Sequence, residues 1–166
     1  MKMILNFCTN DLGGFYLDII KDRQYTTQTD SLARRSAQSA LFHISHAMVR
    51  WLSPILSFTS EEIWQFLPGA SKESIFLQTW YKGLEGNFEN HSIEVARDIN
   101  VYLRKELEQM RRDKIIGSSL DAEVDIYCSD KIHTALLELE SELRFVFITS
   151  EALIHRLGDK PKDAVD

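Results

Sequence analysis

Residues 31–68 decide the fold of this chain, and they read SLARRSAQSALFHISHAMVRWLSPILSFTSEEIWQFLP. Apolar side chains recur in this stretch every three or four residues, and at 100° per residue they form one stripe along a helix. The stripe consists of Ala33, Ala37, Ala40, Ile44, Ala47, Met48, Trp51 and Ile55. Asp30 is the expected N-cap, because its carboxylate can accept hydrogen bonds from the unpaired amides of the first turn. The pattern predicts a long helix with one buried face.

A second helix is expected directly after the first. Pro54 lacks an amide hydrogen, so it should kink or end the first helix near residues 52–53. Thr59 and Glu62 have the spacing of a capping box, in which each side chain binds the other's backbone amide. Pro68-Gly69 then ends the second helix. Its predicted apolar face consists of Ile63, Trp64 and Phe66.

The face of the long helix opposite the stripe carries cations, an amide and aromatic groups. The residues on or near it are Arg34, Arg35, Gln38, Ser39, Phe42 and His46. Lys21 and Arg23 end the preceding helix and are expected alongside. Such a surface suits phosphate contacts combined with stacking on an unpaired base. The alternative is a solvated helix face with one exposed phenylalanine.

Composition sets bounds on the class of protein. The 166 residues hold no apolar run of about 18 that could span a membrane, and the N-terminus lacks the layout of a signal peptide, so we expect a cytoplasmic protein. The net charge of −6 weighs against a nucleic-acid binder. All of that charge falls in residues 67–166, however, and residues 1–66 are neutral. A local basic patch remains compatible with this distribution.

The remaining elements predict a mainly α fold. Residues 3–22 form an amphipathic helix that contains Gly13-Gly14, which predicts close packing against another helix or a backbone approach by RNA. A connector covers 69–90, and a long helix covers 91–116, with Gly117 as its C′ residue. Alternating apolar residues predict a strand at 121–128, followed by a helix to about 141 that Ser129 caps. An apolar, β-rich run predicts a second strand at 143–148.

We therefore expect an antiparallel helix bundle with its connector at 1–90. The long helix and a small strand–helix–strand unit should follow at 91–157, and a flexible tail at 158–166. The long helix carries a second basic strip, and its residues are Arg104, Lys105, Arg111, Arg112 and Lys114. This strip either contacts RNA or serves helix solubility through pairing with Glu108.

No motif in the chain predicts catalysis. The tetrad His43-Ile44-Ser45-His46 differs by one letter from a nucleotide-binding motif, but it lies in mid-helix and lacks the glycine that such a motif needs. A metal pair at this spacing would need a third ligand, and none is placed near it. Glu62 is explained by the predicted capping box. We assign no catalytic residue and no metal ligand.

Two long motifs resemble a known family. The segment RRSAQSALFHISHAMVRWLSPILSFTSEEIWQFLP and the upstream FCTNDLGGFYLDIIKDRQY are similar to the anticodon-binding helical domain of bacterial isoleucyl-tRNA synthetases, which are class I enzymes. The pattern D-L-x-x-F-Y-x-D-x-x-K-D-R-x-Y favours the isoleucine enzymes over their valine, leucine and methionine relatives. The resemblance runs from about Asn6 to about Ser150, so it covers most of the chain.

The resemblance implies a function that composition alone does not. An isoleucyl-tRNA synthetase joins isoleucine to its tRNA using ATP and magnesium, and its catalytic, editing and zinc-binding parts would lie outside this chain. The chain would be a piece of that protein, inactive alone, without a cofactor of its own and monomeric. It would hold the anticodon stem-loop of isoleucine tRNA. The candidate contacts are Lys21, Arg23, Arg34, Arg35, Gln38, Phe42, His46, Arg104, Arg111, Arg112 and Lys114. The competing hypothesis is a helical protein-interaction module.

Overall fold

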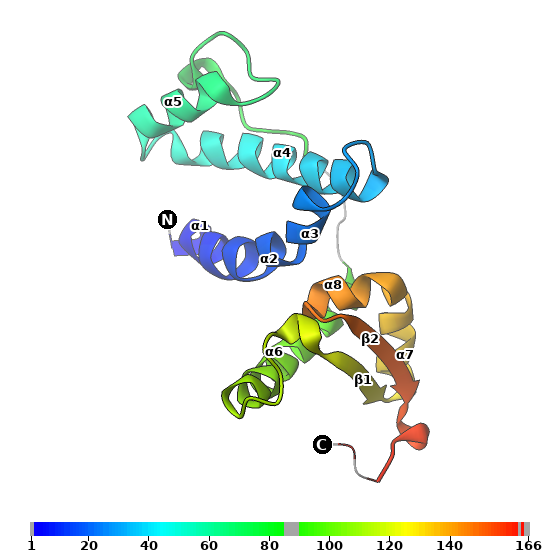
Figure 1. Ribbon diagram of the computed structural model, residues 1–166. Helices are drawn as coiled ribbons and strands as arrows, with labels where there is room; N and C mark the ends of the chain where they lie inside the picture. The colour runs from blue at the N-terminus through cyan, green and yellow to red at the C-terminus, as the bar shows by residue number, and fades with distance from the viewer. Residues whose placement is uncertain (1, 85–89, 163, 165–166) are drawn as a thin grey trace. The chain divides into compact units, whose positions relative to one another are not determined.

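The computed structural model describes residues 2–84, 90–162 and 164 of the chain. It is mainly helical with one small parallel sheet, as the sequence predicts (Figure 1). The chain divides into two compact units, Lys21–Phe88 and a second unit made of Met1–Ile20 with Glu89–Asp166. This division differs from the predicted boundary at residue 90. The N-terminal helix belongs with the C-terminal part because Asp11 binds Arg97 and the carbonyl of Gly14 binds Arg104.

The N-terminal helix is wound more widely than an α-helix over much of its length. It consists of α1 (Lys2–Asn6), the π-helical segment η1 (Phe7–Tyr16) and α2 (Leu17–Ile19). A π-helix pairs each amide with the carbonyl five residues earlier. A Cβ atom on Gly13 would lie 2.9 Å from the carbonyl oxygen of Cys8, and one on Gly14 would lie 2.9 Å from that of Thr9. The glycine pair therefore fits a segment in which backbone groups crowd each other.

The unit Lys21–Phe88 is built on a pair of helices. After α3 (Lys21–Tyr25), the long helix α4 runs from Leu32 to Leu52, and α5 runs from Ser57 to Phe66. Pro54 follows the end of α4, as predicted. The N-cap of α4 is Ser31 and not Asp30, because the Ser31 hydroxyl accepts from the Arg34 amide at 3.3 Å.

The predicted capping box of α5 is wrong. Helix α5 begins two residues before Thr59, so that Thr59 and Glu62 lie inside it. The neighbouring Glu61 binds the connector, because its Oε2 accepts from the Ser74 hydroxyl at 2.8 Å and from the Ile75 amide at 3.0 Å. These bonds fasten the short helix η2 (Ile75–Leu77) of the connector to α5. Residues 85–89 of the predicted connector lie outside the described residues.

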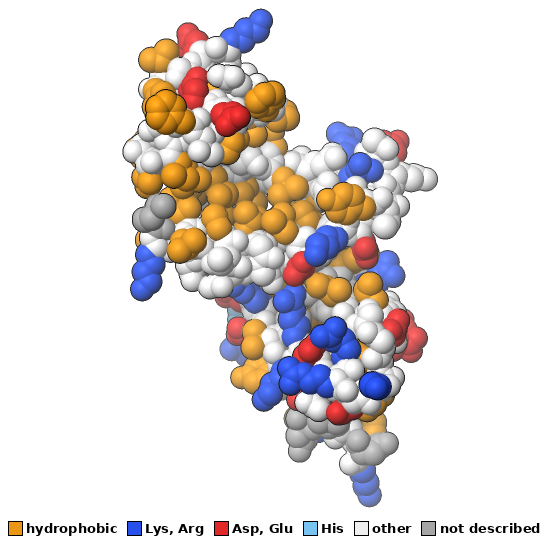
Figure 2. All heavy atoms as spheres, turned by 60° about the vertical axis from the view of Figure 1, so that its left-hand side comes forward, with side chains coloured by type: hydrophobic (Ala, Val, Ile, Leu, Met, Phe, Trp, Pro, Cys, Tyr) orange, Lys and Arg blue, Asp and Glu red, His pale blue; other side chains and the backbone are white. Residues whose placement is uncertain are grey.

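The buried face of α5 is narrower than predicted. Trp64 is 2% exposed and packs with Val49 and Ile75, whereas Ile63 is 47% and Phe66 81% exposed. The exposed side chains of this unit also include Phe58, at 93%. Figure 2 shows hydrophobic side chains, in orange, at the surface of the face in view. No helix of the described residues is long and apolar enough to cross a membrane.

The second unit combines a long helix with a two-stranded sheet. Helix α6 (His91–Arg112) is followed by η3 (Ser119–Asp121), β1 (Glu123–Cys128) and α7 (Asp130–Leu137). The chain continues through η4 (Glu140–Glu142), α8 (Leu143–Phe147), β2 (Glu151–Arg156) and η5 (Leu157–Asp159). The strands pair in parallel, from Glu123 with Glu151 to Cys128 with Arg156. The core consists of Ala96, Cys128, Leu136, Leu143, Val146 and Phe147.

The predicted strand at 143–148 is wrong, because Leu143–Phe147 form α8 and Ile148 caps its C-terminal end. A short apolar run fits a buried helix as well as a buried strand. Leu143, Val146 and Phe147 are all buried, and their spacing of three and four residues is the helical one. The second strand lies further on, at β2. The segment predicted as a flexible tail begins inside η5, since Gly158 and Asp159 belong to that helix.

Helix α6 ends before the position that the sequence predicts. Its last residue is Arg112, and the C′ residue is Lys114, with φ of 60°, instead of Gly117. The amide of Ile115 donates to the carbonyl of Met110 at 2.9 Å, and the amide of Lys114 to that of Arg111 at 3.1 Å. This pair of bonds is the Schellman motif, which glycine usually completes.

Replacing Lys114 by glycine should therefore stabilise the protein. A left-handed conformation strains a residue with a Cβ but not glycine, so we expect the free energy of unfolding to rise by up to about 1 kcal/mol. Urea denaturation of Lys114→Gly would measure the change. The matched control is Lys105→Gly, in the exposed middle of α6, where glycine should instead lower stability by about 1 kcal/mol. A loss of stability in Lys114→Gly would contradict the assigned helix end.

Candidate nucleic-acid interface

The exposed side of α4 forms a hollow, which we call the α4 face. It has a volume of about 290 Å³ and is lined by Arg35, Gln38, Ser39, Phe42 and His43. Three of the sequence-predicted residues, Arg35, Gln38 and Phe42, thus meet at one place because they are three, four and seven residues apart on one helix. The hollow combines a guanidinium, an amide, a hydroxyl and two aromatic rings. This set can bind phosphate, base edges and base planes.

Phe42 is held from behind and open in front. Its ring is 38% exposed, and its centroid lies 4.2 Å from that of the His46 ring. Gly69 approaches from the connector, with φ of 74°, and a Cβ there would come within 3.2 Å of the Phe42 ring. The ring is therefore supported by packing while one side faces the solvent. An aromatic ring placed in this way can stack on an unpaired base without having to be ordered first.

His46 is not on the exposed face, which corrects the sequence prediction. It is 3% exposed, and its Nε2 lies 2.8 Å from the carbonyl oxygen of Pro68. Its Nδ1 lies 3.2 Å from Nη1 of Arg50. A carbonyl only accepts and a guanidinium only donates, so the ring carries its hydrogen on Nε2 and accepts on Nδ1. With both nitrogens bonded, this histidine is satisfied inside the protein and positions Phe42.

The sequence pattern did not reveal the cluster that supports His46. Arg50 lies one turn further along α4, and its Cζ is 4.6 Å from the Trp64 ring centroid and 5.3 Å from that of Tyr81. Burial lowers the pKa of Arg50 from its usual value, and the charge interaction with Tyr81 opposes that change. Nδ1 of His43 lies 2.6 Å from the Tyr81 hydroxyl. The spacing of His46 and Arg50 is a helical signal, but Tyr81 comes from a connector without periodicity.

The other predicted cations of this unit differ in their surroundings. Arg34 is half-buried, and its Nη1 donates to the carbonyl of Thr27 at 3.3 Å, so it fastens the turn before α4. Arg35 is exposed on the α4 face. Lys21 is exposed and Arg23 half-buried, both on α3, which packs against α4. Arg35 is therefore the predicted cation that the α4 face itself contains.

The basic strip of α6 lies in the other unit and is largely paired. Nε and Nη2 of Arg111 both donate to the Glu108 carboxylate at 2.9 Å, and Nε of Arg112 lies 3.5 Å from it. The hydrogen bond from Arg111 lowers the pKa of Glu108, and Glu108 raises that of Arg111. Arg111 and Arg112 therefore fit the alternative in which the basic strip pairs with Glu108 on the same helix. Arg104 donates to the carbonyl of Gly14, and Lys114 ends the helix.

The described residues contain no group of three or more His, Cys, Asp or Glu side chains that could hold a metal ion. The two cysteines, Cys8 and Cys128, are free thiols. Burial raises the pKa of the Cys128 thiol, and the nearby Asp130 carboxylate adds to this effect. A thiol with a raised pKa is a poor nucleophile near neutral pH. Cys128 is therefore a core residue, consistent with its place beside Leu136 and Phe147.

Comparison with known proteins agrees with the sequence motifs. Residues 1–126 match the family described as the anticodon-binding domain of tRNA ligase. The chain is 60% identical over 165 residues to the isoleucine–tRNA ligase of Ruthia magnifica subsp. Calyptogena magnifica, covering 99% of this chain and 18% of that protein. It is 56% identical over 165 residues to that of Ectopseudomonas mendocina, covering 96% of this chain and 18% of the relative.

A third relative is the isoleucine–tRNA ligase of Vesicomyosocius okutanii subsp. Calyptogena okutanii, 50% identical over 197 aligned residues, with all of this chain and 20% of the relative covered. The chain therefore spans about a fifth of the length of these relatives. The family match covers three quarters of the chain, from residue 1 to residue 126, and includes the α4 face and all of α6. The chain thus belongs to the family of anticodon-binding domains of tRNA ligases.

Proposed function

We propose that this chain is the anticodon-binding part of an isoleucine–tRNA ligase and holds the anticodon stem-loop of an isoleucine tRNA at the α4 face. The observation that carries the proposal is the hollow beside Phe42, which lies inside the family match. Phe42 offers a supported ring to an unpaired loop base, Gln38 offers an amide to a base edge, and Arg35 offers a charge to phosphate. The identities of 50–60% to isoleucine–tRNA ligases support the choice of tRNA.

The proposal assigns the chemistry to the rest of a longer polypeptide. Joining isoleucine to tRNA would use ATP and magnesium bound outside this chain, and the chain alone should give no isoleucine-dependent pyrophosphate exchange. We further propose that it acts as a monomer in the cytoplasm. The role of this chain would be to select and position the tRNA, since phosphate contacts fix orientation and base contacts supply specificity.

Two substitutions in the α4 face should weaken RNA binding in different ways. Arg35→Ala should lower affinity and reduce the slope of log affinity against log salt by about 0.7–0.9, because one phosphate contact and its released counterion are lost. Phe42→Ala should weaken binding by about 1–3 kcal/mol through lost stacking and leave the slope unchanged. Fluorescence anisotropy with the anticodon stem-loop of isoleucine tRNA, over a range of salt, would separate the two effects.

The control for these variants is Lys131→Ala, which removes an exposed cation from α7 and should bind as the parent does. Arg34 is left unchanged, since its bond to Thr27 would confuse RNA binding with stability. If both α4 variants keep the parental affinity and the parental salt slope, the α4 face is not the RNA surface. The basic strip of α6 would then be the next candidate. Absence of any stem-loop binding would reject the proposed function.

A further inference from the structure

The α4 face contains one polar side chain to which the proposed function assigns no contact, His43. It lines the hollow together with Arg35, Gln38, Ser39 and Phe42. Its ring stands edge-on to that of Phe42, with the two centroids 5.6 Å apart and the planes at 89°. A histidine ring therefore adjoins the phenylalanine ring that we assign to base stacking, and both belong to the same hollow.

The connector holds His43 through one of its two ring nitrogens. Nδ1 of His43 lies 2.6 Å from the hydroxyl oxygen of Tyr81. Tyr81 is itself held in place, because its ring stacks on that of His46, with the centroids 5.6 Å apart and the planes at 24°, and Cζ of Arg50 lies 5.3 Å from its centroid. A Cβ atom on Gly83 would come within 2.4 Å of the Tyr81 hydroxyl oxygen, so glycine at this position leaves the hydroxyl where it is.

The contact with Tyr81 decides which nitrogen of His43 carries the hydrogen. In a neutral imidazole one nitrogen donates and the other accepts. The Tyr81 hydroxyl has no other acceptor within the described residues. The Arg50 guanidinium beside the phenol ring favours negative charge on that ring, which makes the hydroxyl a stronger donor. The hydroxyl therefore donates to Nδ1 of His43, and the ring hydrogen lies on Nε2.

Nε2 of His43 is the nitrogen that remains for a ligand. It makes no hydrogen bond with any described residue, and it is not buried. Nδ1 is turned to Tyr81, which does not line the hollow, so Nε2 is the polar atom that the ring can offer there. His43 thus presents a hydrogen-bond donor whose ring is already fixed from behind, and such preorganisation reduces the entropy lost on binding.

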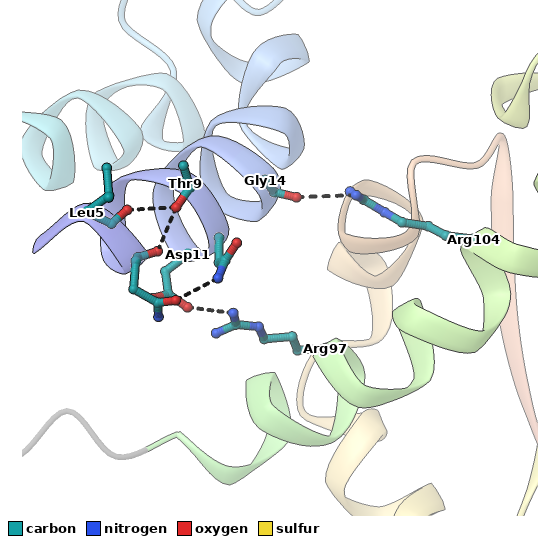
Figure 3. A network of polar contacts seen from close by, with 8 residues as sticks. Leu5, Thr9, Asp11, Gly14, Arg97 and Arg104 are labelled. Carbon is teal, nitrogen blue, oxygen red and sulfur yellow. Dashed lines mark hydrogen bonds and ion pairs between the residues drawn. The ribbon is translucent and has the colours of Figure 1, made fainter. Parts of the chain in front are cut away.

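The arginines between α6 and the N-terminal helix lie in different surroundings, because carboxylates on the facing helix balance their charges. Nη2 of Arg97 donates to Oδ1 of Asp11 at 2.5 Å (Figure 3), and Nη2 of Arg104 lies 3.9 Å from Oδ2 of Asp18. These contacts fasten the N-terminal helix to α6. Nε2 of His43 has no such partner within the described residues, so it is the better candidate for binding an acceptor from outside the chain.

We propose that His43 donates from Nε2 to an acceptor oxygen of the bound RNA, and that Tyr81 is the residue that positions it. The inference rests on the proposed function, since the RNA is the one held at the α4 face. The acceptor is an oxygen of a base carbonyl or of a phosphate, and a ring N–H can bind either. A neutral imidazole carries no charge, so this contact adds affinity without releasing a further counterion.

Two amide variants separate the two nitrogens of His43. In His43→Asn the amide oxygen can replace Nδ1 and keep the bond to Tyr81, but the side chain is too short to reach the place of Nε2. At about pH 8, where histidine side chains are usually neutral, it should weaken binding of the anticodon stem-loop about 2- to 12-fold, the effect of one neutral hydrogen bond. The salt slope should stay unchanged. His43→Gln, whose amide nitrogen can reach the place of Nε2, should restore part of the affinity.

The control is His91→Asn, at an exposed histidine of α6, which should bind the stem-loop as the parent does. Fluorescence anisotropy over a range of salt would measure all of these variants. Parental affinity in His43→Asn would overturn the proposal. So would a greater loss in His43→Gln than in His43→Asn, because the bond to Tyr81 would then matter and the donor at Nε2 would not.

The positioning role of Tyr81 is tested by Tyr81→Phe, which keeps the ring and removes the hydroxyl. In nuclear magnetic resonance spectra of the free chain, the ring nitrogens of His43 should show the hydrogen on Nε2, and Tyr81→Phe should shift the Nδ1 signal. Tyr81→Phe should also weaken stem-loop binding, but adding it to His43→Asn should cause no further loss. A hydrogen on Nδ1 in the parent, or losses that add, would overturn the role of Tyr81.

Modified stem-loops identify the acceptor. Removing one loop base at a time tests for a base carbonyl, and replacing one loop phosphate at a time by a neutral methylphosphonate tests for a phosphate oxygen. The change that removes the acceptor should weaken binding to the parent more than binding to His43→Asn, in which the contact is already missing. If every change costs the two chains equally, His43 contacts no RNA acceptor and the proposal is overturned.

The proposed function and the role of His43 fail in distinguishable ways. Stem-loop binding that depends on Arg35 and Phe42 but not on His43 keeps the proposed function and rejects the contact from Nε2. Absence of stem-loop binding to the parent rejects the proposed function and the contact together. The position of the ring hydrogen is measured without RNA, so it tests the bond between Tyr81 and His43 in either case.

Discussion

Trp64→Ala should lower the free energy of unfolding of the Lys21–Phe88 unit by about 3–5 kcal/mol. Trp64 is 2% exposed and packs with Val49 and Ile75, so truncation leaves a cavity between α4, α5 and the connector. Its indole nitrogen also donates to the carbonyl of Glu73 at 2.8 Å, and without it that carbonyl would keep only the longer contact with the Ser71 hydroxyl at 3.5 Å. Such a loss is a large part of the stability of an ordinary domain.

The matched comparison for Trp64→Ala is Trp51→Ala, in the same unit of the chain. The sequence pattern places Trp51 on the buried stripe of the long helix, from which one would expect Trp51→Ala to be the more damaging of the two substitutions. The structure reverses the order, since Trp51 is only half-buried. Hydrogen exchange of amides in α4 and α5, with thermal unfolding, would measure both variants. Equal losses, or a greater loss in Trp51→Ala, would contradict the packing of the unit.

Phe147→Ala should destabilise the other unit by a similar amount, about 3–5 kcal/mol. Phe147 is 1% exposed and belongs to the core with Leu136, Leu143 and Val146. Phe145 is the matched control, because it is half-buried and two residues away on α8. Two residues on a helix are separated by 200°, but on a strand they share a face. A helix therefore predicts unequal losses and a strand predicts equal ones.

Urea denaturation of both variants, monitored by circular dichroism, would measure the loss in free energy of unfolding. A loss in Phe145→Ala as large as that in Phe147→Ala would favour the strand that the sequence alone suggested. Because α8 is a helix, we expect Phe145→Ala to lose much less, about 1 kcal/mol as in typical point mutants.

Local periodicity was enough to predict the helices at α4, α5 and α6, the strand β1 and the mainly α class. It was not enough to predict which polar residue is buried. His46 carries a side chain that usually faces water, and it is inside because the carbonyl of Pro68 lies beside it. That partner is 22 residues away in the sequence, so no window of a helical length could find it.

Much the same limit applies to the candidate site. Arg35, Gln38 and Phe42 were predicted together because a helix fixes their relation, and the structure places them around one hollow. Arg50 and Tyr81 were missed, since their roles depend on how the connector folds back on α4. The balance of carboxylates around Arg97 and Arg104 was also invisible, because Asp11 is 86 residues from Arg97.

The discontinuous unit has a consequence for the order in which the chain folds during synthesis. Residues 21–88 form a compact unit that is complete before any of α6 has been made. The helix of residues 2–19 is made before that unit but has to wait for its partners, since Arg97 and Arg104 emerge some 90 residues later. The sheet closes last, because Cys128 pairs with Arg156. Contacts of long sequence separation form slowly, so the first segment of the chain is among the last to dock.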